Sequence, residues 1–418
     1  MKKLLRYLSV LFFLVVQLSA DAGTVIVAQG TAVPSLAKAI AKARKGDTIL
    51  VKPGIYRESN IHITKQLYII GEQFPVIDGE KKEEILLIES NSVVIEGLVV
   101  RNGGYSSYND IAAIRIVNAD GVKIRNNRLE NTFFGIYSQH GTNAEISFNR
   151  IHSNARDEQN SANGIHCWKS DRMFIHDNEV TGHRDGIYFE FVTNSVIRNN
   201  HCFGNVRYGL HFMFSNDDRY ESNRFNANGA GVAVMYSHHV TMLNNRFFDN
   251  WGDAAYGLLL KEISDGELSG NQFQKNSIGV YMESSNRLNI HHNSFTGNGW
   301  ALKMQASCEA NTITSNNFRS NSFDVATNGM LVLNTYAGNY WDKYEGYDLN
   351  RDGTGDVPYR PVSVYSYIIE RNPTALMLFR SFIVGLLDRS EKVMPGITPE
   401  ALKDDRPLMK PLPLKSGS

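Results

Sequence analysis

A histidine and a methionine stand two residues apart in the segment GLHFMF, at His211 and Met213. Residues two apart in a β-strand point to the same face, so these two side chains share one face. Met235 occupies the position equivalent to Met213 in the next repeat. His166 occupies the position equivalent to His211 two repeats earlier. Imidazole nitrogen and thioether sulfur together favour copper(I) over calcium, magnesium or zinc. The four residues are therefore candidate copper(I) ligands.

A second group of candidate ligands carries oxygen atoms. Asp348, Asn350 and Asp352 alternate with other residues before a glycine, as at the start of a calcium-binding loop, and Asp356 stands at the ninth position. The twelfth position, normally Glu, is Tyr359, so an EF-hand is not supported. The same residue types also favour tight turns without any ion.

The elements that must position these residues are repeats of about 22 residues. An Asn-x-apolar phrase recurs at Asn127, Asn149, Asn178, Asn200, Asn223, Asn245, Asn271, Asn293 and Asn316. A Gly-apolar-x-apolar phrase falls between them at Gly135, Gly164, Gly186, Gly209, Gly231, Gly257 and Gly279. The segments are short, β-branched and of period two, which excludes helical repeats. The pattern predicts an all-β fold, a parallel β-helix solenoid.

The recurring asparagines are predicted to be structural. In stacked coils, identical side chains lie about 4.8 Å apart, so their amides can bond to one another along the stack. The same alternation places Cys167 and Cys202 in the core as buried thiols. With three cysteines in 418 residues, the chain is not a disulfide scaffold.

The outward positions of the glycine-phrase strand form an exposed stripe in this interpretation. Its members are aromatic, sulfur-containing or charged side chains: Tyr137, His166, Trp168, Tyr188, Glu190, His211, Met213 and Met235. Longer coils place their extra residues at the corner before this strand, which often marks the binding side of a solenoid. The stripe fits a partner-docking surface formed by Tyr137, Trp168, Tyr188 and Glu190, a platform for sugar rings, or a soft-metal site.

Both ends of the chain differ from the repeats. Residues 1–22 fit a secretory signal peptide, with a membrane anchor as the alternative. The segment 23–325 is assigned to the β-helix with a capping helix near 34–44, and 326–372 to a loop module. The segment 373–418 is assigned to an apolar helix and a Pro-rich tail that is extended, wrapping a surface or loose.

The apolar helix has two interpretations: a cap on the last coil, or a surface that docks on a membrane partner. The second makes Leu378, Phe379, Phe382, Ile383 and Leu386 partner-binding residues. Lys plus Arg and Asp plus Glu both number 43, so nothing suggests a nucleic-acid partner.

The segments GDTILVKPGIYRE, GNYWDKYEGYDLNRDGTGDVPYRP and FRSFIVGLLDRSEKVMPGI, together with the 22-residue coils, resemble the NosD family of periplasmic nitrous oxide reductase maturation proteins. The resemblance covers nearly the whole mature chain. It implies a right-handed parallel β-helix, attached to a membrane ABC transporter permease at the inner membrane. It further implies copper delivery and copper–sulfur cluster assembly on nitrous oxide reductase, with a copper chaperone lipoprotein as another partner, and no catalytic residues.

The rival interpretation is an enzyme that cleaves or epimerises polysaccharides, or a plain carbohydrate-binding module. Enzymatic chemistry of this kind needs converging carboxylates and a base. The candidates are Asp185, Glu190, Asp217 and Asp218. Asp185 precedes a predicted strand and Glu190 lies within it, whereas Asp217 and Asp218 lie in the turn after the next strand, so a converging pair is not evident.

Overall fold

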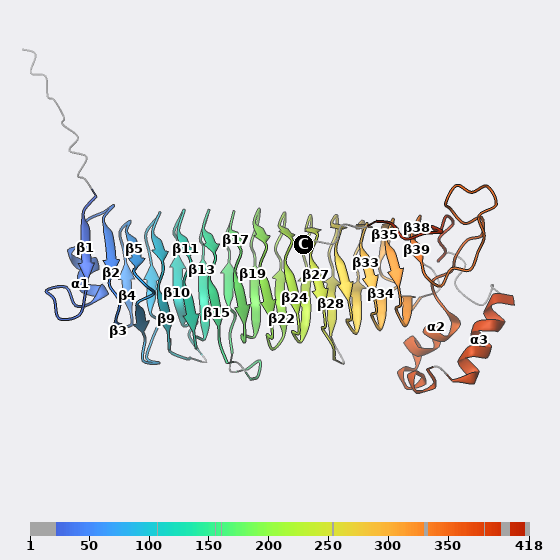
Figure 1. Cartoon of the computed structure of the whole chain (residues 1–418), viewed down its shortest axis with the longest axis horizontal. Helices are drawn as coiled ribbons and strands as arrows, with labels where there is room; N and C mark the ends of the chain where they lie inside the picture. The colour runs from blue at the N-terminus through green and yellow to red at the C-terminus, as the bar shows by residue number, and fades with distance from the viewer. Residues whose placement is uncertain are drawn as a thin grey trace, which may run out of the picture.

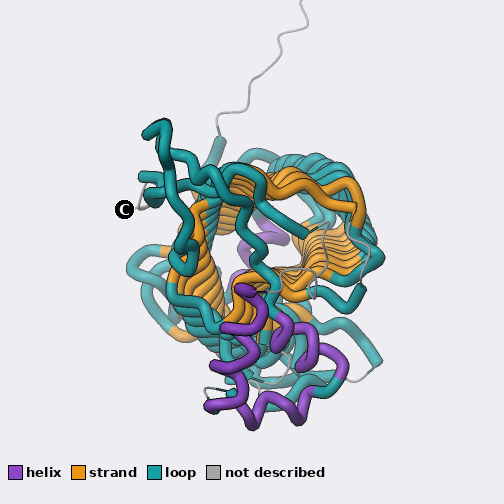
Figure 2. The backbone as a smooth tube through the Cα atoms, turned by 90° about the vertical axis from the view of Figure 1, so that its right-hand side faces the viewer, coloured by secondary structure: helices purple, strands orange, loops and turns teal. Residues whose placement is uncertain are grey.

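Short strands repeat along the chain, and each pairs in parallel with the equivalent strand of the next coil (Figure 1). The computed structural model describes residues 22–413, except 107, 155, 160, 253–254, 330–332, 380 and 394–401. The signal peptide expected at 1–22 lies outside the described residues, apart from Ala22. Viewed along its length, the described chain is a tube whose sides are three sheets (Figure 2).

The described part of the first sheet has 14 strands. They are β1 (Thr24–Val27), β2 (Thr48–Val51), β5 (Tyr68–Gly71), β8 (Val94–Glu96), β11 (Lys123–Arg125), β14 (Glu145–Ser147), β17 (Phe174–His176), β20 (Val196–Arg198), β23 (Arg219–Glu221), β26 (Thr241–Leu243), β29 (Glu267–Ser269), β32 (Asn289–His291), β35 (Glu309–Thr314) and β38 (Leu333–Ala337).

The second sheet has 13 strands within the described residues. They are β3 (Ile55–Arg57), β6 (Val76–Asp78), β9 (Val99–Arg101), β12 (Arg128–Glu130), β15 (Arg150–His152), β18 (Glu179–Thr181), β21 (His201–Phe203), β24 (Arg224–Asn226), β27 (Arg246–Phe248), β30 (Gln272–Gln274), β33 (Ser294–Thr296), β36 (Asn317–Arg319) and β39 (Tyr340–Trp341).

The third sheet carries the glycine phrase and has 12 strands in the part of the chain that is described. They are β4 (Ile61–Ile63), β7 (Leu86–Ile88), β10 (Ala112–Val117), β13 (Phe134–Gln139), β16 (Ile165–Trp168), β19 (Asp185–Glu190), β22 (Tyr208–Met213), β25 (Ala230–Met235), β28 (Tyr256–Lys261), β31 (Ile278–Glu283), β34 (Trp300–Met304) and β37 (Phe323–Ala326).

The asparagine column is the ladder that the sequence predicts. Each side-chain amide Nδ2 donates to the Oδ1 of the next coil's asparagine at 2.9–3.1 Å, from Asn127 to Asn339. The same Oδ1 also accepts from the backbone N of the preceding asparagine, so the buried corner is satisfied and coil-to-coil register is fixed. A second ladder, from Asn205 to Asn321, was not predicted.

Coil spacing explains the glycine column. A Cβ at Gly209 would lie 2.8 Å from the carbonyl oxygen of Gly231 and 2.9 Å from the Asn228 amide. Backbone therefore approaches backbone too closely for a larger residue. Inside the tube, the rings of Phe225, Phe247, Phe273, Phe295, Phe318 and Trp341 stack with centroids 4.1–5.5 Å apart. Apolar burial along this column stabilises every coil against its neighbours.

The N-terminal cap is the short helix α1 (Leu36–Lys42), as predicted. Ser35 accepts from the backbone N of Lys38, which caps the first turn. The Glu58 carboxylate accepts from the backbone N of Leu36 and of Ala37, and Leu36 is fully buried against the first coil. The helix thus covers the apolar end of the tube.

The C-terminal end is more elaborate than predicted. The sheets continue past residue 325 to β39, and α2 (Val364–Arg371) was not predicted at all. The apolar segment is not one helix, because the 3-10 helix η1 (Pro373–Leu378) is followed by non-helical backbone at Phe379 before α3 (Phe382–Val393). The Pro-rich tail wraps the last coil rather than lying loose: the amide of Asn317 and the backbone of Leu412 exchange two hydrogen bonds.

The tail also ends the asparagine ladder. Asp404 is fully buried, and its carboxylate accepts from the backbone N and Nδ2 of Asn339 and from Nε1 of Trp341. It accepts as well from the backbone N of Gly338 and of Arg406. A carboxylate has only acceptors, so it suits the end of a chain of donors.

Asp404→Ala should therefore leave several buried donors unpaired and reduce the free energy of unfolding of the C-terminal coils by about 3 kcal/mol. Hydrogen exchange of the strands β36, β38 and β39 measures this loss directly. Asp405→Ala, whose side chain is 60% exposed, is the matched control and should leave exchange unchanged. Equal exchange in the two variants would contradict the structural role of Asp404.

Candidate functional site

The outward-pointing residues of the third sheet lie in two rows, as the repeats predict. Tyr137, His166, Tyr188 and His211 are register neighbours on successive strands from β13 to β22. The adjacent row contains Trp168, Glu190, Met213 and Met235, and Met213 and Met235 pair directly across β22 and β25. Neighbours within a row are therefore one strand spacing apart.

The prediction that the whole stripe is exposed is wrong for the first row. Tyr137, His166, Tyr188 and His211 are only 4–8% exposed, although they point away from the tube's core. Tyr137 packs with Ala112, Phe134 and Ala162 in a small apolar cluster outside the tube, with Phe133 and Trp168 against it. Phe133 and Ala162 come from the corner segments before β13 and β16, whereas the His211 ring packs beside Tyr188 and Tyr208. Trp168, Glu190, Met213 and Met235 stay half-buried.

His211 is held by a buried ion pair. Arg207 donates to the two Asp185 oxygens at 2.9 and 2.5 Å, and His211 Nδ1 lies 3.4 Å from Asp185 Oδ2. Burial alone would raise the pKa of Asp185, but hydrogen bonds from His211 and Arg207 lower it to about 2. The ionised carboxylate orients the ring, and Nε2 is left buried without a partner. A carboxylate on one ring nitrogen is the usual arrangement behind a metal-ligating histidine.

His166, like His211, has a ring nitrogen without a hydrogen-bond partner, but it lies elsewhere in the row. Its Nε2 is buried without a partner, and burial, reinforced by Arg184, lowers its pKa to about 3. The ring is therefore neutral at pH 7. However, three strand steps separate β16 from β25, so His166 lies ~14 Å from Met235. The four candidate copper ligands cannot share one ion. Met213 and Met235 are register neighbours and His211 stands two residues before Met213 in β22, whereas His166 lies apart.

The methionine pair sits in a mixed environment. Met213 Sδ accepts a hydrogen bond from the Tyr188 hydroxyl at 3.6 Å. Glu190 flanks Met213 in the row, and Lys261 flanks Met235, where it pairs with Glu283 at 3.5 Å. Cys167 and Cys202 are fully buried, and burial raises the pKa of both thiols, so neither supplies a thiolate ligand.

A groove of about 600 Å³ lies over the N-terminal part of the stripe. Its walls are the corner segments and the stripe itself, with side chains that include Tyr108, Asp110, Tyr137, His166, Trp168, Arg184, Tyr188 and Glu190. Arg184 donates to Asn163 Oδ1 at 3.2 Å, and its Nε is buried without a partner. The groove therefore offers aromatic faces and unpaired polar atoms to a ligand or a partner protein.

The carboxylates proposed for the enzyme interpretation have separate environments. The Asp185 carboxylate accepts a hydrogen bond from Arg207 and lies within hydrogen-bond distance of His211. Asp218 is buried and accepts from the backbone N of Ser195, and burial raises its pKa well above the usual value. Asp217 is exposed in the turn before β23, beside His239. Asp185, Asp218 and Asp217 therefore contact different partners, and Glu190 is half-buried beside Met213 in the outward row.

The candidate calcium loop is built as a set of turns. Asp348 accepts from the backbone N of Asp352 and of Gly353, Asp352 accepts from Thr354, and Asp356 accepts from Leu349. Asn350 accepts from the backbone N of Asp352 as well. The side-chain oxygens thus satisfy local backbone donors, which supports the turn interpretation over calcium.

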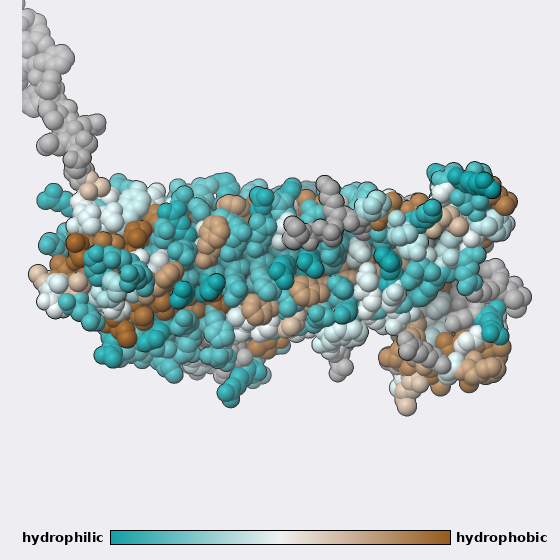
Figure 3. All heavy atoms as spheres, in the orientation of Figure 1, coloured by the Kyte–Doolittle hydropathy of each residue, from teal (hydrophilic) through white to brown (hydrophobic). Residues whose placement is uncertain are grey.

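The C-terminal helices have two faces. Val384 and Phe379 pack with Tyr365, Ile369 and Phe323 in a cluster that joins the helices to the last coil, so Phe379 belongs to the cap. Leu378, Phe382, Ile383 and Leu386 are 46–85% exposed and form the apolar surface seen at the lower right of Figure 3. No described helix is long and apolar enough to cross a membrane.

The described chain is thus a parallel β-helix solenoid with an aromatic and methionine-rich pair of rows on the outer face of its third sheet. The chain is 30% identical over 378 residues to a Pseudomonas aeruginosa protein called probable ABC transporter binding protein NosD, covering 84% of this chain and 86% of that protein. A family model described as periplasmic copper-binding protein (NosD) matches residues 147–346. The chain belongs to the NosD family.

Further similarities cover a shorter part of the chain or concern its fold. A Stutzerimonas stutzeri protein of the same description is 29% identical over 119 residues, which is 28% of this chain and 27% of that protein. Among solved structures, a GH87 α-1,3-glucanase catalytic unit from Streptomyces thermodiastaticus has a TM-score of 0.62 at 12% identity, covering 77% of this chain and 69% of that chain. The AlgE6 mannuronan C-5 epimerase A-module from Azotobacter vinelandii has a TM-score of 0.51 at 14% identity, covering 73% and 89%. These two likenesses concern the fold alone.

The buried neutral ring of His166 predicts acid sensitivity. Its pKa in the folded protein is about 3, below the ~6.5 of an unfolded histidine. As the pH falls below 6.5, the unfolded chain gains a proton that the folded chain does not, so stability falls by up to about 1.4 kcal/mol per pH unit from this group. His166→Phe, which keeps a ring between Tyr137 and Tyr188, should reduce the loss of stability between pH 7.5 and 5.0.

Urea unfolding at the two pH values measures this difference. His292→Phe changes an exposed histidine and serves as the control. A wild-type pH dependence in His166→Phe would show that His166 is protonated in the folded protein, contrary to its burial.

Proposed function

We propose that this chain is a periplasmic accessory protein that binds copper(I) at Met213, Met235 and His211 and delivers it to nitrous oxide reductase. The observation that carries the proposal is the direct pairing of Met213 with Met235 across neighbouring strands, with His211 on the same face as Met213. Thioether sulfur is polarizable and uncharged, so it suits a soft monovalent ion and competes weakly for hard ones. Membership of a family described as copper-binding supports the same choice of metal.

The position of the site suits transfer rather than storage. The methionines are half-buried on a sheet whose register is fixed on both sides, so a donor or acceptor protein can reach the sulfur atoms. In this proposal a copper chaperone lipoprotein loads the site, and nitrous oxide reductase docks over the groove beside Trp168 and Tyr188. Assistance with copper–sulfur cluster assembly belongs to the same proposal.

The exposed apolar face of η1 and α3 is assigned to a membrane ABC transporter permease. The relatives from Pseudomonas aeruginosa and Stutzerimonas stutzeri carry the name ABC transporter binding protein, which supports this partner. Phe382, Ile383 and Leu386 project from the end of the solenoid and are 85, 57 and 55% exposed. Large apolar side chains in such a contiguous set are typical of docking surfaces.

Replacing both methionines tests the copper site. Met213→Leu with Met235→Leu preserves volume, so the fold and the melting temperature should change little. Copper(I) affinity, measured by competition with a chromophoric chelator, should fall at least about tenfold because two sulfur ligands are lost. Met377→Leu, which removes a 90% exposed methionine elsewhere, is the control. If the double variant binds copper(I) as tightly as wild type but no longer binds its partner, the stripe is a docking surface and the copper(I) proposal is rejected.

Charge placed on the helical face tests the transporter contact. Ile383→Glu with Leu386→Glu should abolish copurification with the membrane transporter, because a carboxylate cannot be buried in an apolar interface without a partner. The solenoid should remain folded, since Val384 still packs on Tyr365 and Ile369. Ile26→Glu at the opposite end, where the side chain is 50% exposed, is the matched control. If the double variant still copurifies with the transporter, the exposed apolar face does not form that contact and the helices serve only to cap the solenoid.

A further inference from the structure

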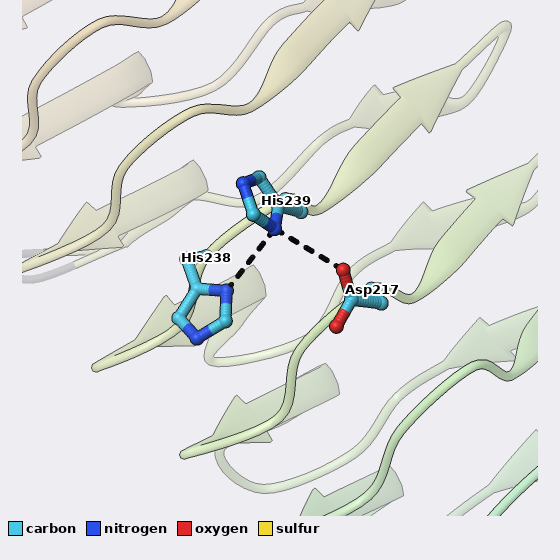
Figure 4. Close-up of side chains that lie close together, drawn as sticks. All are labelled: Asp217, His238 and His239. Atoms are coloured by element: carbon cyan, nitrogen blue, oxygen red, sulfur yellow. Dashed lines mark hydrogen bonds and ion pairs between the residues drawn. The ribbon is translucent and has the colours of Figure 1, made fainter.

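Two adjacent histidines and an aspartate meet on the surface, away from the methionine pair. Asp217 lies in the turn between β22 and β23, and His238 and His239 lie in the equivalent turn one coil later (Figure 4). His239 Nδ1 is 3.3 Å from His238 Nδ1 and 3.1 Å from Asp217 Oδ1. Within the described residues, this is the only group of three His, Cys, Asp or Glu side chains that places one ligand atom each within 4.8 Å of the others.

The backbone conformation of the two turns brings the Asp217 and His239 side chains together. Asp217 and His239 both adopt left-handed backbone conformations, with φ of 58° and 54°, and they occupy the same place in successive turns. The backbone N of Asp217 donates to the carbonyl of His238 at 3.2 Å, and the backbone N of His238 donates to Asn216 Oδ1 at 2.9 Å. The two turns are therefore locked in register, and their side chains project to the same side.

The atoms are spaced as ligands of one ion would be. Two ligand atoms each about 2.0–2.1 Å from a tetrahedral metal are ~3.3 Å apart. The observed separations of 3.3 and 3.1 Å match this spacing. Asp265, one coil further on, accepts two hydrogen bonds from Arg287, so we do not count its carboxylate among the ligands. All three residues are exposed, which leaves room for a fourth ligand from water or a partner.

We propose that Asp217, His238 and His239 form a surface site for a divalent transition-metal ion, Cu(II) or Zn(II). Two imidazoles and a carboxylate suit ions of borderline hardness, whereas the thioethers of Met213 and Met235 suit copper(I). The site differs from the proposed copper(I) site in residues, ligand type and oxidation state, and it does not depend on that proposal. It lies in the turns that follow the two methionine-bearing strands, β22 and β25.

The experiment uses the tag-free mature protein, freed of metal. Calorimetric titration with Cu(II), and separately with Zn(II), should show one site that is weakened at least about tenfold in His239→Ala, in His238→Ala and in Asp217→Asn. Electron paramagnetic resonance of the Cu(II) form should show coupling to two imidazole nitrogens, falling to one in either histidine variant. Far-ultraviolet circular dichroism confirms that each variant keeps the solenoid.

A matched control comes from the second adjacent histidine pair. His291 Nδ1 and His292 Nδ1 are 2.8 Å apart, but Glu267 contacts the opposite ring nitrogen of His291, so the three ligand atoms do not converge. His291→Ala with His292→Ala should leave the affinity unchanged. Wild-type affinity in His239→Ala, or an equal loss in the control pair, would overturn the site. Retained copper(I) binding in the Asp217, His238 and His239 variants is expected, because that ion is assigned to the methionines.

Discussion

The spacing of one coil from the next, held by the buried asparagine ladder, is the constraint on which the rest of the structure depends. Each Asn ties the corner of its own coil to the next through both its side-chain amide and its backbone N. An unpaired amide in this corner would be costly, so a slip of register is strongly opposed. Residues that share a place in the repeat are therefore neighbours in space, even when 22–29 residues separate them.

This constraint turns a sequence pattern into binding geometry. Met213 and Met235 lie side by side because their strands are successive coils, and Asp217 and His239 meet for the same reason. In the two proposed metal sites, this register alone places the paired side chains beside one another. Asp185 adds orientation, since its ionised carboxylate holds one nitrogen of His211 and leaves the other unpaired. A pre-organised surface of this kind loses little entropy on binding and suits brief occupation followed by transfer.

The sequence alone predicted the solenoid, the asparagine ladder, the glycine column and the core positions of Cys167 and Cys202. In a strict repeat, equivalent residues of successive coils must be neighbours, so the spacing of the repeat gives the register of the strands. Burial of Tyr137 in the outward row was not predictable in this way, because Phe133 and Ala162, which pack in its cluster, lie in non-repeating corner segments. Asp404 joins Asn339 across 65 residues, a contact that no local pattern indicates. His166 was grouped with Met235 although three strand steps separate them. The Asp217–His239 contact was missed because both residues lie in turns outside the strand phrases.

The most direct test of copper(I) binding through thioether sulfur is X-ray absorption of the selenomethionine-labelled protein loaded with one equivalent of copper(I). Because Cys167, Cys202 and Cys308 are all buried, the selenium atoms of exposed or half-buried methionines are the accessible soft ligands. Binding at Met213 and Met235 predicts a copper–selenium shell at both the copper and the selenium edges, accompanied by an imidazole nitrogen. A copper environment of nitrogen and oxygen alone, with no selenium neighbour, would contradict it.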